Sequence, residues 1–167
     1  MKTLFPILFL LVALNAFSQK TSQYDNIPLN TAADFRKAEP QVILAADYAY
    51  SSPIDKENTN RLNAITFVMQ WMKGTSDYSF GMDETISKIS NGDREIYGIY
   101  FICLAKYALS KGKGVDREDA KYNAYVMMAD YCENPVNNFK MRGEVKKMAE
   151  AKKQGQLKEF LDSKKKK

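Results

Sequence analysis

Two aspartates, Asp47 and Asp130, stand near the carboxyl ends of predicted helices, each within the tripeptide Ala-Asp-Tyr. A carboxylate at that end faces the negative pole of the helix dipole, so each one requires a nearby cation. If the chain turns back in an antiparallel hairpin after each aspartate, Arg61 and Asp47 lie at the same distance from the turn, on facing helices. Arg142 falls at the height of Asp130 in the same way. We therefore predict two structural ion pairs, one in each of two related hairpins.

The same carboxylates could serve a different chemistry. Two Asp or Glu side chains are enough to cleave a glycosidic bond, one as the acid and the other as the base or nucleophile. Nothing in the spacing of the acids makes them converge on a cleft. A carboxylate-dependent enzyme acting on glycans is therefore the alternative interpretation.

Histidine is absent from the chain. Its absence removes the Ser-His and Cys-His nucleophile pairs and the commonest protein ligand of metals. The adjacent acids Asp83-Glu84 and Glu118-Asp119 stand at predicted helix starts, where acids complement the dipole. The glycines of 111–114 follow a helix and lack the strand-to-helix setting of a phosphate loop. We predict no catalytic residue, no metal site and no cofactor.

Aromatic residues gather around the predicted loop 74–81. Tyr78 and Phe80 lie on this loop, and Trp71 lies just before it. Aromatic side chains on a loop either plug the core or form a recognition patch, so these three are the candidate binding patch. Tyrosines are also frequent between residues 97 and 131. Packing of the core and its boundary explains these tyrosines most simply, and a groove that binds a sugar or peptide is the functional alternative.

The two cysteines, Cys103 and Cys132, are too few for a disulfide framework. In a hairpin of the two predicted helices that carry them, their heights differ by roughly 10 Å, which exceeds the reach of a disulfide. We predict two buried thiols.

The apolar spacing follows a helical period, and no stretch alternates between apolar and polar residues. We therefore predict a single compact all-α bundle of five to seven helices, with two related helical hairpins around a central long helix as one arrangement. Pro40 should end or kink the first helix, because proline lacks the amide donor and clashes with the preceding turn. The predicted helices span residues 31–38, 40–50, 56–73, 83–90, 93–111, 116–133 and 138–153, with a final turn or two in 156–162.

The chain begins with features of an export signal. Lys2 supplies a positive start, Leu4 to Leu14 form an apolar run, and Ala16-Phe17-Ser18 end it with small residues at 16 and 18 before a polar segment. We predict cleavage near Ser18 and a periplasmic or secreted location. The remaining chain divides into an extended polar lead at 19–30, a helical domain at 31–162 and a lysine tail at 163–167.

The formal charge of +5 does not indicate nucleic acid as a partner. Lys2 and the run Lys164 to Lys167 account for the whole excess of positive charge. Four adjacent lysines repel one another, so we expect a solvated tail. Each lysine would add about 1 kcal/mol near an anionic membrane, and we expect no membrane contact beyond that weak effect.

Four segments together resemble an uncharacterised family of small exported all-helical proteins of Bacteroidetes-type bacteria. They are Ile27–Asn30 with the nearby pair Asp34-Phe35, Asn63–Trp71, Gly74–Phe80 and Asp130–Pro135, and they follow an export signal that ends in Phe-Ser-Gln. The resemblance implies an all-helical fold and a periplasmic or secreted location, and it brings no activity and no functional residues. We therefore expect a binding or structural accessory protein, whose partner is another protein or a small-molecule ligand.

Overall fold

The computed structural model describes residues 22–81 and 83–165. Within these residues the chain forms seven α-helices, one short 3-10 helix and no strand, which confirms the predicted all-α bundle. The predicted leader at 1–18 lies outside the described residues. The helices are α1 Ala32–Ser51, α2 Thr59–Gly74, α3 Glu84–Ser90, α4 Arg94–Lys111, α5 Arg117–Glu133, η1 Pro135–Asn137, α6 Gly143–Lys153 and α7 Leu157–Lys165.

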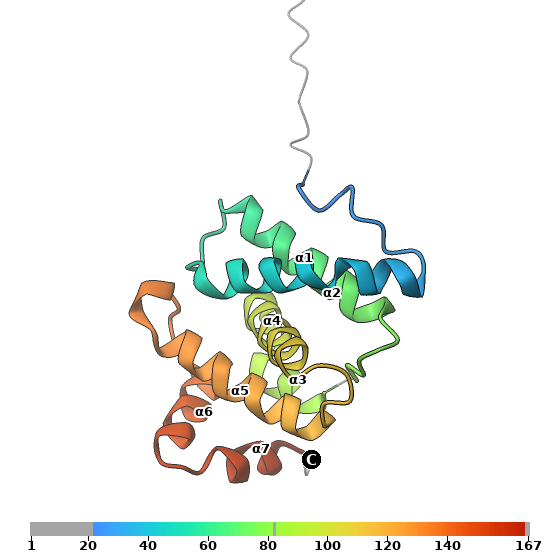
Figure 1. Ribbon diagram of the computed structural model, residues 1–167. Helices are drawn as coiled ribbons and strands as arrows, with labels where there is room; N and C mark the ends of the chain where they lie inside the picture. The colour runs from blue at the N-terminus through green and yellow to red at the C-terminus, as the bar shows by residue number, and fades with distance from the viewer. Residues whose placement is uncertain (1–21, 82, 166–167) are drawn as a thin grey trace, which may run out of the picture.

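Helix α4 is the centre of the bundle. It contacts α1, α2, α3 and α5, and Figure 1 shows it end-on between the α1–α2 pair and α5. Helices α6 and α7 pack against each other and against α3 at the far end from α1. The hairpins α1–α2 and α5–α6 thus lie on opposite sides of a central long helix, as the sequence predicts.

Side-chain caps fix where the helices begin. Thr31 and Asp34 form a reciprocal capping box at the start of α1. Asp83, Asp93 and Asp116 each accept a hydrogen bond from a backbone N–H in the first turn of α3, α4 and α5. These acids also complement the positive helix end.

The predicted break at Pro40 is wrong. Helix α1 runs without interruption across Pro40, which is exposed. Ala38 and Val42, on either side of it, are buried in the core. Burial of this helix face offsets the hydrogen bond that proline cannot make.

The last long helix begins later than predicted, at residue 143 rather than 138. Pro135–Asn137 form the 3-10 turn η1, and Asn138 follows it in the left-handed region at φ 55°. A tertiary contact holds this segment, because the backbone N–H of Ile54 donates to the Asn137 carbonyl at 3.0 Å. The buried Asn137 amide in turn donates to the Tyr131 carbonyl at 2.9 Å.

Where the structure describes them, both ends of the chain differ from the prediction of an extended lead and a solvated tail, and residues 19–21 and 166–167 lie outside the described residues. Residues 22–27 form turns, and the buried Tyr24 ring stacks on Phe67 with centroids 4.7 Å apart. Helix α7 continues to Lys165. Lys164 pairs with Glu144 at 2.5 Å, so packing orders the first lysines of the tail.

The cysteines confirm the predicted buried thiols, since both are free and buried. Burial raises the pKa of the Cys132 thiol to about 12 and raises that of Cys103 as well. Among the residues that the structure describes, no helix is both long and apolar enough to cross a membrane.

Candidate functional site

The loop between α2 and α3 encloses a cavity of about 230 Å³ against the α4–α5 hairpin. Residues 76–81 form one wall. Leu104 and Ala108 of α4 and Ala120 of α5 supply an apolar floor, and the connection 114–115 closes the end. We call this space the loop cavity.

The structure brings the three predicted patch residues together but gives them different roles. Trp71 is fully buried, and its indole N–H donates to the Phe35 carbonyl at 2.8 Å. Tyr78 and Phe80 are half-buried, and their ring centroids lie 5.5 and 5.8 Å from that of Trp71. Trp71 is therefore a core residue, whereas Tyr78 and Phe80 rest on it and line the loop cavity.

Two cations fasten the loop to the rest of the bundle through Asp77. Its carboxylate lies 2.9 Å from Nε of Arg36 on α1 and 2.6 Å from Nζ of Lys113 in the α4–α5 connection. Hydrogen bonds from both cations hold the pKa of Asp77 well below its usual range. Asp77 is thus a structural anchor at the rim of the loop cavity.

Arg117, the first residue of α5, also lines the loop cavity. Its guanidinium lies against Gly81, where an added Cβ would come within 1.6 Å of a terminal nitrogen. Throughout residues 22–81 and 83–165, no carboxylate lies within ion-pair distance of Arg117. The other cation of the lining, Lys121, pairs with Glu118 at 3.1 Å.

A second cavity of about 320 Å³ lies between the start of α3, the start of α5 and α7. Asp83 lines it and uses both carboxylate oxygens. One caps α3, and the other accepts hydrogen bonds from the hydroxyls of Tyr100 at 2.7 Å and Tyr125 at 2.9 Å. Burial and this carboxylate raise the pKa of both tyrosines. Asp83 therefore caps α3 and links it to α4 and α5 through the two tyrosine hydroxyls.

The other acids of the second cavity are also engaged. Glu118 pairs with Lys121 and Lys165, and these cations lower its pKa. Asp119 accepts a hydrogen bond from the Tyr107 hydroxyl at 2.8 Å, and Asp162 pairs with Lys165 at 3.3 Å. The general acid of a glycoside hydrolase needs a raised pKa. The pKa of Glu118 is lowered instead. Over the described ranges, no group of three or more Cys, Asp or Glu side chains could hold a metal ion.

The two predicted ion pairs are wrong in their partners. Asp47 pairs with Lys106 of α4, because α1 packs against α4 as well as against α2. Asp130 pairs with Lys152 at 2.5 Å. Each aspartate has the cation that its place near a helix end requires, but the cation comes from a helix position that hairpin counting did not identify.

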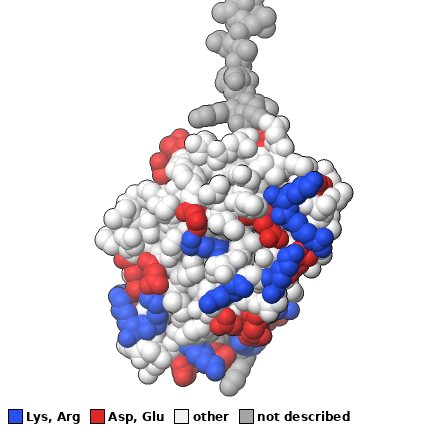
Figure 2. Space-filling view, viewed as in Figure 1, with Lys and Arg blue, Asp and Glu red and all other residues white. Residues whose placement is uncertain are grey.

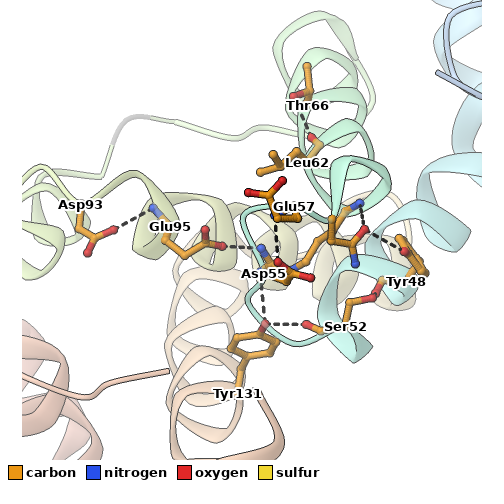
Figure 3. A network of polar contacts seen from close by, with 11 residues as sticks. Tyr48, Ser52, Asp55, Glu57, Leu62, Thr66, Asp93, Glu95 and Tyr131 are labelled. Carbon is orange, nitrogen blue, oxygen red and sulfur yellow. Dashed lines mark hydrogen bonds and ion pairs between the residues drawn. The ribbon is translucent and has the colours of Figure 1, made fainter. Parts of the chain in front are cut away.

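Arg61 and Arg142 pair elsewhere. Arg61 is 1% exposed and donates to Glu95 of α4 at 2.5 Å and to the Tyr131 hydroxyl at 3.2 Å. That hydroxyl donates onward to the Ser52 carbonyl at 2.7 Å, as Figure 3 shows. Among the described residues Arg142 pairs with Asp93 alone, at 4.0 Å, and its side chain is 85% exposed.

The surface charges are interspersed. In the face shown in Figure 2, lysines and arginines alternate with aspartates and glutamates, and no broad region has a single sign. This pattern follows from the many ion pairs across the bundle, such as Lys153 with Glu133 at 2.7 Å.

Sequence reasoning did not identify Arg117 or Gly81 as site residues. In the sequence, Arg117 follows the cap Asp116 and has the pattern of an ordinary polar residue in a first helical turn. Gly81 has the pattern of a loop residue. Only the fold brings them together.

Comparison of the chain with protein-family models, with curated proteins and with solved structures finds no match. The site is therefore assigned from its own geometry.

Proposed function

We propose that this chain is an exported accessory protein that binds a small molecule in the loop cavity. The observation that carries the proposal is the composition of that cavity. It has an apolar floor, a wall made by Tyr78 and Phe80, and charged residues at its rim, which is the usual make-up of a small-molecule site.

The charge arrangement supports binding over catalysis. Asp77 is the one carboxylate among the described residues that line the loop cavity. It is held between Arg36 and Lys113, which lower its pKa, so it is a poor general acid and is not free to act as a base. A histidine-free glycan-cleaving mechanism needs two available carboxylates, and this cavity does not supply them.

A fragment screen tests the proposal. Amide resonances of ¹⁵N-labelled protein, from residue 19 onward, are followed by NMR while small aromatic and aliphatic fragments are added. We expect binders to shift the resonances of residues 76–81 and 114–121. Ser79 is exposed and lines the cavity, so Ser79→Tyr should block the cavity and abolish the shifts without unfolding the protein.

The matched control is Ser163→Tyr, a serine on α7 that is also exposed and does not line the loop cavity. It should leave the shifts unchanged. A screen without shifts at the loop cavity, or shifts that persist in Ser79→Tyr, would contradict the proposal.

Export is tested separately by fractionation of cells that express the full chain. We expect the protein in the periplasm or medium, and intact-mass measurement should place its first residue near Gln19. A full-length protein in the cytoplasm would contradict export.

A further inference from the structure

We infer that the loop cavity selects a small organic carboxylate, an apolar ring or branched chain carrying one negative charge, and that Arg117 is its counter-ion. This inference rests on the proposed function and deepens it by naming the class of ligand.

The first argument is the charge balance of the lining. Two cations, Arg117 and Lys121, face one anion, Asp77. Asp77 is already bound by two other cations, Arg36 and Lys113. Lys121 is paired with Glu118 at 3.1 Å. Arg117 is therefore the one lining cation that no carboxylate of the described residues neutralises.

The second argument is that the neighbouring acids are committed elsewhere. Asp116 caps α5 by accepting from the backbone N–H of Asp119 at 2.8 Å. Glu118 pairs with Lys121 and Lys165, and Asp119 accepts from the Tyr107 hydroxyl. Although three acids surround Arg117 in the sequence, none of them pairs with it.

The third argument is the space provided at Gly81. Its φ lies outside the left-handed region, so the backbone conformation does not require glycine there. The Arg117 guanidinium occupies the place of the missing side chain, with its central carbon 2.2 Å from an added Cβ. Glycine at this position therefore lets the guanidinium lie against the loop, at the cavity lining.

Chemistry and size then define the ligand. A guanidinium binds a carboxylate through two parallel hydrogen bonds, which fixes both charge and orientation. A cavity of about 150 Å³ is known to hold benzene, so about 230 Å³ has room for a ring with a short side chain. The floor of Leu104, Ala108 and Ala120 suits such an apolar body.

The test uses three probes of nearly equal shape: phenylacetate, phenylacetamide and 2-phenylethylammonium. Affinities are measured by NMR titration of the protein from residue 19 onward. We expect phenylacetate to bind about tenfold more tightly than phenylacetamide, because a charge-assisted hydrogen bond is stronger than a neutral one. The cation should bind most weakly.

Two variants assign this preference to Arg117. Arg117→Gln should remove the advantage of phenylacetate and leave phenylacetamide binding nearly unchanged. Gly81→Ala should do the same, because the methyl group displaces the guanidinium. The exposed Arg142, which does not line the cavity, provides the control Arg142→Gln, and this variant should keep the full preference.

The outcomes separate the two proposals. If fragments bind at the loop cavity but phenylacetate has no advantage, or keeps it in Arg117→Gln, the carboxylate inference is wrong and the binding function stands. Failure of phenylacetate to bind while neutral fragments do also overturns the inference. If nothing binds there, both proposals are wrong.

Discussion

Arg61 is a fully buried cation, and its position explains how four helices meet. Its guanidinium on α2 contacts Glu95 on α4 and Tyr131 on α5, and Tyr131 in turn contacts the end of α1 at Ser52. Nε of Arg61 has no hydrogen-bond partner in the described part of the chain. Burying a charge is costly, so removal of either partner should cost more than the intact pair contributes.

The first prediction follows from that asymmetry. Arg61→Ala should lower the free energy of unfolding by about 3 kcal/mol, since it leaves the Glu95 carboxylate and the Tyr131 hydroxyl without their buried donor. The measurement is urea unfolding followed by circular dichroism. Arg142→Ala is the control and should change stability by less than about 0.5 kcal/mol, because that side chain is 85% exposed. Equal losses in the two variants would show that the Arg61 contacts add nothing.

At the scale of elements, helix α1 contains an internal proline, which lacks the backbone N–H that an α-helix uses for its hydrogen bonds. Its buried face of Ala38, Val42, Ala45 and Ala46 packs into the core, and this burial keeps the 20-residue helix continuous. Pro40 itself is exposed and is not part of the hydrophobic core. Packing of the proline ring therefore does not compensate for the lost backbone hydrogen bond.

The second prediction is that Pro40→Ala stabilises the protein. Restoring the amide donor should raise the free energy of unfolding by about 2 kcal/mol, which is the helix penalty of proline reduced by the greater freedom of the unfolded chain. Urea unfolding again measures the change. Lys37→Ala, an exposed change in the same helix, should alter stability by less than about 0.5 kcal/mol. A destabilised Pro40→Ala would mean that the proline is needed for the course of α1.

At the scale of the whole molecule, burial keeps several acidic groups protonated. The pKa of Cys132 is raised to about 12 from an ordinary 9.0, and that of Tyr50 is raised to about 12 from 10.0, both mainly by burial. Burial also raises the pKa of the Cys103 thiol. In the unfolded chain these groups lose their protons at lower pH than in the folded protein, so the folded state binds more protons in alkaline solution.

The third prediction is a loss of stability in alkali. Because the unfolded state binds fewer protons above about pH 9, stability should fall as pH rises from 9 toward 12, by up to about 1.4 kcal/mol per pH unit for each such group. Urea midpoints at neutral pH and at several alkaline values measure this slope. Cys132→Ala removes one buried thiol and should make the slope shallower. An unchanged slope in this variant would show that the Cys132 thiol does not contribute.

The local structure follows largely from residue types along the chain. The caps at Thr31, Asp83, Asp93 and Asp116 and the left-handed exit at Asn91 could be predicted, because each depends on one side chain and the few backbone groups next to it. The buried thiols could also be predicted, since short apolar side chains in a helical core need no particular partner. The all-α class follows from the helical period of the apolar residues.

The choice of partners required the tertiary structure. Asp47 is close in sequence to Arg61 but pairs with Lys106, and the loop anchor Asp77 joins Arg36 to Lys113. The loop cavity likewise depends on Gly81 meeting Arg117 across the bundle. The sequence by itself determined the helical class, the caps and the apolar faces, because those depend on neighbours within a turn. Only the packing of helices decided which charges pair and where a cavity forms, because those contacts join residues that are distant along the chain.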